Sequence, residues 1–211
     1  MGTIKTTNIE TITGSGTLTI GQSGETISIP TNTTLGASGS TITIPSGCTI
    51  TNNGTQTGFG GTMTPAFSAY RSSNQTISDA TITKVQFNTE IYDGQNTYDN
   101  STNYRFTPAS TGYYLINANV SLMSTAGANV MIDNYIWLYE NGSQIAISQN
   151  YGNSNSKDTW GQHALSVIVH SDNVSDYYEI FAYGEVTSGN VDVAGNSTVQ
   201  FSSFNALKII L

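Results

Sequence analysis

The sequence predicts an all-β protein, with a short N-terminal stem of β-repeats followed by a β-sandwich or jelly roll. Only 9% of the residues are charged, against roughly 25% in an average soluble protein, and Thr, Ser, Asn and Gly supply the polarity instead. β-Branched and aromatic residues favour strands, whereas Asn and Gly favour turns. Short apolar alternations separated by turn residues recur to the C-terminus, a pattern typical of a sandwich or jelly roll.

Composition also argues against several classes of function. The formal net charge is -8, with 6 Lys and Arg and no basic cluster. Nucleic acid is therefore a poor partner, because clustered cations are needed to displace phosphate counterions. No run approaches the roughly 18 apolar residues of a spanning helix, so we expect no membrane insertion. The first ten residues lack the apolar core of a secretory signal, which favours synthesis in a cytoplasm.

Residues 6–50 consist of three repeats, at 6–20, 21–35 and 36–50. Apolar positions alternate within each repeat, as in short half-buried strands, and we interpret the lone cysteine, Cys48, as a small buried side chain. Each repeat has few apolar residues, so we expect them to be buried against other chains or a docking surface. The two aligned apolar columns are Ile12, Ile27 and Ile42, and Ile20, Leu35 and Ile50.

A Gly-rich stretch follows the repeats, so we place the stem at 1–57, a hinge at 58–64 and a head at 65–211. Roughly eight to ten strands are expected in the head, with no substantial helix. The clearest signal is "YIWLYENGSQIAIS", where an Asn141-Gly142 turn joins Tyr135–Glu140 to Gln144–Ser148 in a hairpin. Another strand, "GYYLINANVSLM", places five residues on one face: Tyr114, Ile116, Ala118, Val120 and Leu122.

The stretch "FNTEIYDGQNTYDNSTNYRFTPASTGYYLINANV" resembles a known signature, that of the globular head of complement's collagen-like recognition subunit. That family lies in the tumour-necrosis-factor-like jelly-roll superfamily. The resemblance departs from the signature by one extra residue between Tyr98 and Phe106, and it does not reach residues 1–60. "WLYENGSQI" is similar to the family's "LYKNG" hairpin. The signature positions are Phe87, Asp93, Tyr98, Phe106, Gly112 and Tyr114.

This resemblance implies a homotrimer whose head caps a trimeric stalk. The last strand and an aromatic sheet face would pack near the threefold axis, with Tyr135, Trp137 and Tyr139 as candidates. Three copies of the stem could then bury together what one cannot.

Such heads on Thr/Gly-repeat stems look like those of tailed-bacteriophage particles. The implied function is that of a non-enzymatic capsid decoration, cement or head-fibre protein on the surface of a virion assembled in the host cytoplasm. Its N-terminal repeats would bind the major capsid protein or another virion protein. The alternatives are a tail fibre or receptor-binding tip, and a bacterial lectin-like module.

No catalytic motif is recognisable in the sequence. His163 and His170 are seven residues apart on one strand, so they lie on opposite faces and are not paired ligands. The acid pairs Asp172/Asp176 and Asp93/Asp99 could be glycosidase-like, but their polar turn segments favour solvated carboxylates. We therefore expect no enzyme activity and no cofactor.

Two weaker binding hypotheses remain. Calcium would need oxygen ligands, for which Asp93, Asp99, Asp133 and Asp192 are the candidates, although no calcium-loop order is present. The Asn-rich segment "NYGNSNSKDTW" carries Tyr151 and Trp160 at its ends, and exposed aromatics beside amides suit contact with a host-surface glycan. The alternative is an ordinary loop with Trp160 in the core.

Overall fold

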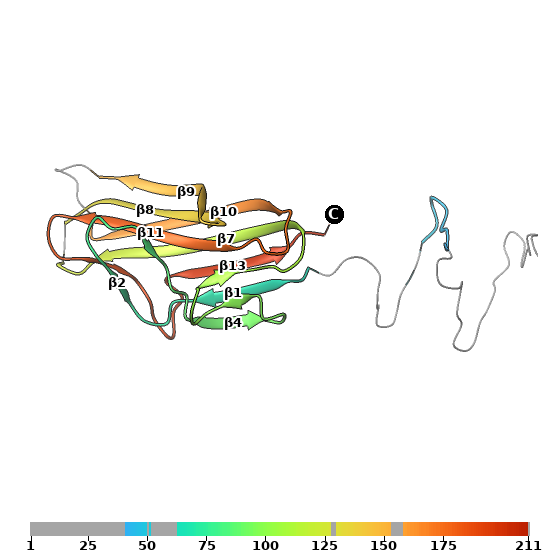
Figure 1. Cartoon of the computed structure of the whole chain (residues 1–211), viewed down its shortest axis with the longest axis horizontal. Coiled ribbons are helices and arrows are strands. Elements are labelled where there is room, and N and C mark those ends of the chain that lie inside the picture. The colour runs from blue at the N-terminus through green and yellow to red at the C-terminus, as the bar shows by residue number, and fades with distance from the viewer. Residues whose placement is uncertain (1–40, 50, 52–62, 128–129, 153–157, 211) are drawn as a thin grey trace, which may run out of the picture. The chain divides into compact units, whose positions relative to one another are not determined.

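The computed structural model describes residues 41–49, 51, 63–127, 130–152 and 158–210 (Figure 1). The chain divides into two units, Met1–Thr55 and Gln56–Leu211. The described residues form thirteen strands and no helix, all within the second unit. In chain order they are β1 (Ala66–Tyr70), β2 (Gln75–Ile77), β3 (Thr83–Lys84), β4 (Thr89–Asp93), β5 (Tyr98–Asp99), β6 (Arg105–Phe106), β7 (Gly112–Ser124), β8 (Met131–Glu140), β9 (Ser143–Tyr151), β10 (Trp160–Ser171), β11 (Tyr178–Val186), β12 (Val191–Val193) and β13 (Ser203–Lys208).

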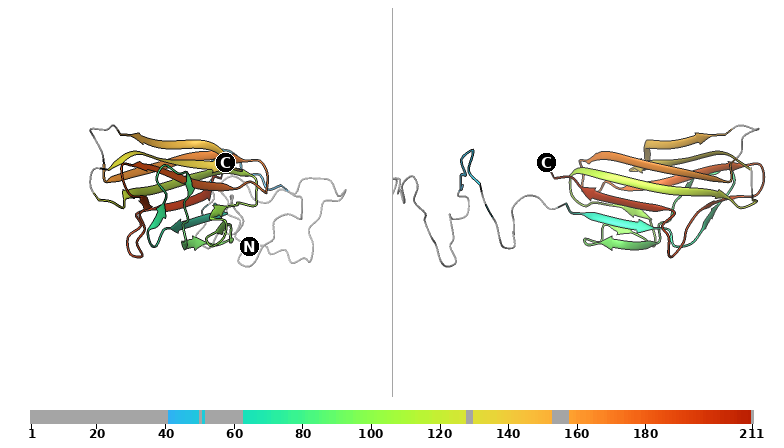
Figure 2. Two further views of the ribbon diagram at one scale, coloured as in Figure 1. Left: turned by 60° about the vertical axis from the view of Figure 1, so that its left-hand side comes forward. Right: turned by 180° about the vertical axis from the view of Figure 1, so that it is seen from behind.

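The strands form two antiparallel sheets, which confirms the predicted sandwich. Sheet A has the order β2-β12-β7-β13-β1-β4. Strand β10 also pairs with β7, along the edge of β7 that faces away from β13. Sheet B has the order β5-β6-β11-β8-β9, with β3 also paired to β11. Figures 1 and 2 show the long strands β7 and β10 of sheet A lying across from β8 and β11 of sheet B. The non-consecutive neighbours give the head its jelly-roll connections.

Alternation along the long strands fills the space between the sheets. The β7 residues predicted to share a face are all buried, at 0–2% exposure: Tyr114, Ile116, Ala118, Val120 and Leu122. The predicted hairpin is also confirmed, since β8 ends at Glu140 and β9 begins at Ser143. Asn141 and Gly142 have φ values of 50° and 80°, as a two-residue turn that matches strand twist requires.

The signature residues form much of this core rather than an exposed site. Phe67 of β1 stacks on Tyr98 with ring centroids 4.6 Å apart and lies 4.8 Å from Phe106. The ring of Phe106 in turn meets that of Tyr114 edge-on at 5.7 Å. Phe87 is fully buried, and its carbonyl accepts a 3.2 Å hydrogen bond from the Tyr98 hydroxyl. The spacing of the signature therefore reflects how aromatic rings from four strands and a loop meet.

The remaining two signature residues shape the backbone. Asp93 accepts a 2.7 Å hydrogen bond from the backbone N–H of Tyr98 and a 3.2 Å bond from the Thr97 hydroxyl, which closes the β4–β5 turn. Gly112 has a φ of 139°, a conformation that residues with a Cβ rarely adopt. An added Cβ there would also lie 2.9 Å from the Lys208 side chain.

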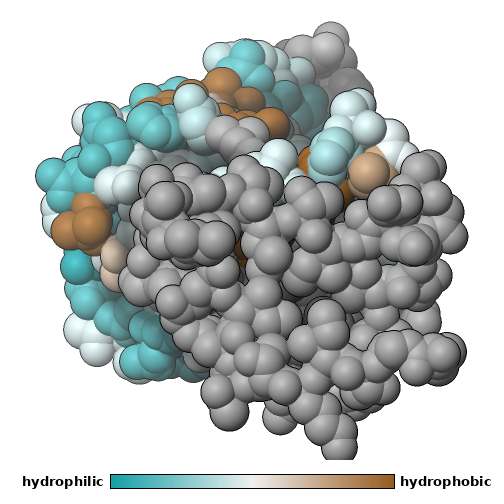
Figure 3. Space-filling model, turned by 90° about the vertical axis from the view of Figure 1, so that its right-hand side faces the viewer, coloured by the Kyte–Doolittle hydropathy of each residue, from teal (hydrophilic) through white to brown (hydrophobic). Residues whose placement is uncertain are grey.

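The two ends of the head lie beside each other. Strands β1 and β13 pair antiparallel, with Ala66 opposite Leu207, and the Lys208 N–H donates to the Pro65 carbonyl at 3.2 Å. The start of β1 and the end of β13 consequently emerge at one end of the sandwich (Figure 1). Seen from that end, the described surface not hidden by grey atoms is mostly hydrophilic, with separate hydrophobic patches (Figure 3).

Little of the predicted stem falls within the described residues. Five of its six apolar column positions, all but Ile42, lie outside them. Residues 41–49 contain a turn at Ser46–Gly47 and no strand, and Ile42 is 56% exposed. The prediction that Cys48 is buried is wrong for the single chain, where this cysteine is exposed. The physical reason is that a strand needs a hydrogen-bonding neighbour, and residues 41–49 have none among the described residues.

Candidate functional site

The adjoining strands β10, β7, β13 and β1 of sheet A carry no Lys, Arg, Asp or Glu on their outer face. The carboxylate of Asp192 lies on the same face of β12, opposite Met123. Residues that point outward on β10 alternate with buried ones, and the register then fixes which residues of β7, β13 and β1 share their face. These outward residues are Trp160, Gln162, Ala164, Ser166, Ile168 and His170 on β10, Tyr113, Leu115, Asn117, Asn119, Ser121 and Met123 on β7, Ser203, Asn205 and Leu207 on β13, and Ala66, Ser68 and Tyr70 on β1.

Two kinds of row cross this face. An apolar row runs through Ile168, Leu115 and Leu207, which lie directly opposite one another on three strands, and Ile168 is 63% exposed. Amide rows lie beside it. Gln162 donates to Asn119 at 2.6 Å and accepts from Ser121 at 2.8 Å, so these polar groups are already paired within the face.

The outer face of sheet B is aromatic. It holds the three residues predicted at a trimer interface, Tyr135, Trp137 and Tyr139, but they pack against rings that the sequence analysis did not connect with them. Ring centroids of Tyr135 and Tyr183 lie 5.2 Å apart in a stacked arrangement, and Tyr135 meets Tyr151 at 5.1 Å. We call the six rings the aromatic stripe: Tyr135, Trp137, Tyr139, Tyr151, Phe181 and Tyr183.

Carboxylates lie along the aromatic stripe. Glu185 of β11 is directly opposite Asp133 of β8, a like-charge cross-strand pair. The Tyr183 hydroxyl donates to Glu185 Oε2 at 3.2 Å. Burial raises the pKa of Tyr135, and a hydrogen bond to Asp133 raises this pKa further. The tyrosine hydroxyls therefore stay protonated and donate toward the acids.

The two candidate glycan contacts, Tyr151 and Trp160, lie on different sheets. Tyr151 is 66% exposed and belongs to the aromatic stripe of sheet B. Trp160 is 49% exposed at the edge of sheet A, where its ring lies 6.0 Å from that of Phe201. The interpretation of Trp160 as a core residue is thus wrong, and the structure does not join these two residues in one site.

The four candidate calcium ligands are not brought together. Asp93, Asp99, Asp133 and Asp192 lie on β4, β5, β8 and β12. Each also accepts hydrogen bonds from the protein; Asp192, for example, accepts from Thr76 at 2.6 Å. Across the described ranges, no three His, Cys, Asp or Glu side chains gather as a metal site would require.

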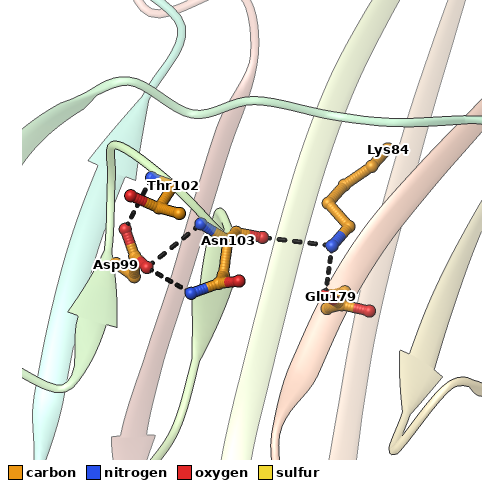
Figure 4. Close-up of polar contacts among 5 residues, drawn as sticks. All are labelled: Lys84, Asp99, Thr102, Asn103 and Glu179. Carbon is orange, nitrogen blue, oxygen red and sulfur yellow. Dashed lines mark hydrogen bonds and ion pairs between the residues drawn. The ribbon is translucent and has the colours of Figure 1, made fainter.

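Asp99 instead holds the loop that contains the extra residue of the signature. Its carboxylate accepts from the backbone N–H of Ser101 at 3.0 Å. It also accepts from the backbone N–H of Thr102 at 2.8 Å and of Asn103 at 3.0 Å (Figure 4). These bonds, that of Thr102 first, lower the pKa of Asp99. The insertion is therefore accommodated by a closed loop between β5 and β6, beside a polar hollow that the loop lines.

The same loop is tied to a buried ion pair. The Lys84 ammonium pairs with the Glu179 carboxylate and also donates to the Asn103 carbonyl at 3.1 Å (Figure 4). Glu179 is only 5% exposed, so the cation satisfies a carboxylate that burial would otherwise penalise. This pair joins β3 to β11.

The other titratable candidates are also structural. Asp176 is 5% exposed and accepts from Asn141, Ser171 and Asn173, so the expectation of a solvated carboxylate is wrong for it. Its three donors explain why a turn can hold a buried charge.

The two histidines lie on opposite faces, as predicted. His170 is exposed, and His163 is buried between the sheets. The ring of His163 contacts Asn134 Oδ1 at 2.5 Å and the Ser148 hydroxyl at 3.3 Å, and burial lowers its pKa.

A family model described as the C1q domain matches residues 66–204. The chain belongs to the C1q domain family. No curated protein matches the sequence. The family match confirms the resemblance for the head. The division of the chain into a stem at 1–57, a hinge at 58–64 and a head at 65–211 stays a prediction.

Several solved structures resemble the C1q head at low identity. Eiger TNF from S. frugiperda has a TM-score of 0.47 and 10% identity, over 68% of this chain and 91% of that one. Murine APRIL at pH 5.0 has a TM-score of 0.44 and 11% identity, over 68% and 99%. The PRD1 vertex protein P5 has a TM-score of 0.44 and 11% identity, over 68% and 72%. Similarities at this level do not bear on function. No helix among the described residues is long and apolar enough to span a membrane.

Sequence reasoning missed the uncharged face of sheet A and the link of Phe181 and Tyr183 to the aromatic stripe. A signal for the first was present, because "WGQHALSVIVHS" contains no acid and no Lys or Arg. The link needed the β8–β11 register, in which Tyr183 lies opposite Tyr135 and Phe181 opposite Trp137. Strands this far apart in the sequence leave no local pattern that reveals their pairing.

Proposed function

We propose that this protein is a non-enzymatic, homotrimeric structural protein of a virus particle, with the C1q head facing outward. The N-terminal repeats at 1–57 attach it to the major capsid protein or another virion protein. The observation that carries the self-association is the absence of Lys, Arg, Asp and Glu from the outer face of β10, β7, β13 and β1. Charged residues are depleted at the centres of protein interfaces, whereas a surface meant for solvent in an acidic chain would carry acids.

Sheet A is a better candidate for the contact between copies than the aromatic residues predicted from the sequence. The face around Tyr135, Trp137 and Tyr139 also carries Asp133 and Glu185, which would need desolvation in an interface. The sheet A face requires no such desolvation of charge. The sequence-based choice of Tyr135, Trp137 and Tyr139 stays a prediction, and the two faces make different predictions for mutants.

The ends of the head are compatible with attachment through the N-terminal repeats. The start of β1 and the end of β13 are adjacent at one end of the sandwich, so the chain enters the head at that end. Three parallel heads would then place three stems side by side, where the apolar columns could be buried together. Location on the virion surface, and on the capsid rather than the tail, rests on the repeat-stem resemblance alone.

Sedimentation equilibrium on the full chain tests the assembly. We expect a trimer, and we expect Ile168→Asp to dissociate it, because a carboxylate would be buried without a partner. Ile168 is 63% exposed in the single chain, so this change should leave the head folded. The matched control is Ile91→Asp on β4, at 53% exposure and outside β10, β7, β13 and β1.

A monomeric wild-type chain at micromolar concentration would refute the trimer. A trimer that survives Ile168→Asp but is lost in Tyr139→Asp would move the interface to sheet B. Location is tested separately, by counting copies per virion against the major capsid protein. A count of a few copies would favour the tail-fibre alternative, and glycan binding by a chain absent from virions would favour the lectin-like one.

A further inference from the structure

We propose that the aromatic stripe on sheet B is a binding surface for an uncharged carbohydrate chain, with Tyr151, Tyr135 and Tyr183 as stacking rings and Asp133 and Glu185 as acceptors for sugar hydroxyls. It rests on the proposed function in one respect, because copies that meet through sheet A leave the outer face of sheet B open. Trp160 is not part of this surface, and the proposal does not require calcium.

The first argument is the continuity of the rings across strands. Tyr151 lies on β9, Tyr135 on β8 and Tyr183 on β11, and successive centroids are 5.1 and 5.2 Å apart. Neighbouring strands are about 4.8 Å apart, so the three rings cross roughly 10 Å of sheet. That width suits more than one sugar ring, which indicates an oligosaccharide rather than a monosaccharide.

The second argument is that two carboxylates lie beside the rings, where they would disfavour binding of a hydrophobic partner. Asp133 and Glu185 oppose each other across β8 and β11, an arrangement that is destabilising on its own. Both already accept hydrogen bonds, Asp133 from the Gly152 N–H at 3.2 Å and from the Tyr135 hydroxyl, and Glu185 from the Tyr183 hydroxyl. A carboxylate offers about four lone-pair sites, so acceptors remain. Sugar hydroxyls are donors that match them beside a ring face.

Charge narrows the class of carbohydrate. The chain has a net charge of -8, and Asp133 and Glu185 lie opposite each other. The cation beside the stripe, Lys84 over the ring of Phe181, is already paired with a third acid, Glu179. Sialylated, sulfated and uronic-acid chains would be repelled. An apolar peptide or a second copy of this chain would have to desolvate both carboxylates without donors to replace water. Uncharged hexoses and N-acetylhexosamines avoid both penalties.

The rings of the stripe differ in solvent exposure. Tyr151 is 66% exposed, whereas Trp137 is 8% exposed beneath its neighbours. Trp137 also contacts Tyr135 at 5.6 Å and Tyr183 at 6.3 Å. It supports the rings rather than stacking on a ligand, and its indole is well placed to report binding by fluorescence.

Titration calorimetry on the full chain tests the inference. The probes are uncharged hexasaccharides of glucose, mannose, galactose and N-acetylglucosamine, with an oligogalacturonate as the anionic comparison. At least one neutral probe should bind, and the anionic one should not. Tyr151→Ala and Glu185→Gln should each weaken binding about tenfold, as expected for loss of an exposed stacking ring or of a charged acceptor.

Tyr92→Ala is the matched control, a tyrosine at 51% exposure on β4 of the other sheet, and it should bind like the wild type. Trp160→Ala should also bind normally. Absence of binding by every neutral probe at millimolar concentration overturns the inference, as does equal loss in Tyr92→Ala or Trp160→Ala. Dissociation of the oligomer by Tyr151→Ala overturns it too, because the stripe would then be an interface between copies. The oligomeric state of the wild type tests the proposed function independently of these titrations.

Discussion

Replacing Phe106 by Ala should be among the most destabilising single changes in the head. Phe106 is fully buried, and removal of such a ring costs about 3–5 kcal/mol through lost transfer energy and a residual cavity. Its ring also contacts Phe67 at 4.8 Å and Tyr114 at 5.7 Å, and each aromatic pair adds about 0.5–1.5 kcal/mol. Since the cavity lies between packed rings that collapse poorly, we expect about 4–5 kcal/mol. A typical domain has about 5–15 kcal/mol in total.

The control for Phe106→Ala is Phe201→Ala. Phe201 is 37% exposed, and its ring contacts that of Trp160. We therefore expect Phe201→Ala to lower the free energy of unfolding by about 1 kcal/mol or less. Urea unfolding, followed by tryptophan fluorescence at one fixed protomer concentration, measures both variants, because an oligomer's apparent stability depends on concentration. Equal losses in the two variants would refute the view that the signature records core packing.

Three further predictions concern stability. Asp99→Asn should weaken the β5–β6 loop by about 1–2 kcal/mol at neutral pH. Because hydrogen bonds lower the pKa of Asp99, its contribution is present above the unfolded value of about 3.9 and is lost as pH falls, so unfolding curves of the variant should be less acid-sensitive. Burial lowers the pKa of His163, so its neutral form stabilises the fold above about pH 6.5, and this contribution is lost below that pH. In a plot of urea midpoint against pH, His163→Gln should therefore reduce the loss of stability below about pH 6.5. An unchanged plot would contradict this prediction. Gly112→Ala should cost about 1–3 kcal/mol in thermal or urea unfolding because its φ is 139°, whereas a neutral effect would show that the backbone relaxes there.

The strands and their buried faces were predictable because period-two alternation is a local property. Tyr114 and Leu122 could be assigned to one face without knowledge of any partner, and Asn141-Gly142 fixed a hairpin within fourteen residues of sequence. The roles of single polar residues were less predictable. The burial of Asp176 depends on Asn141, which comes from a different hairpin. The prediction of a buried Cys48 was wrong for a related reason, because that burial needs neighbours that a single chain does not supply.

The candidate surfaces were harder to predict because they are made by register between distant strands. Tyr135 and Tyr139 were recognised as an aromatic strand face, but a strand face alone does not distinguish an interface from a binding surface. That distinction came from Glu185, which the β8–β11 pairing places opposite Asp133. The absence of charge on sheet A likewise became meaningful only when β10, β7, β13 and β1 were seen to share one face.

The two faces suggest a division of labour that follows from charge. A trimer closes most readily through surfaces that lose little hydration, and the sheet A face, with its amides already paired as in Gln162 and Asn119, meets that requirement. A carbohydrate is itself hydrated, so its site benefits from rings that exclude water next to acids that accept hydroxyls. The sheet B face has both. If the copies instead met through sheet B, the like-charged residues Asp133 and Glu185 would be buried together three times around the axis, at a desolvation cost that an interface through β10, β7, β13 and β1 avoids.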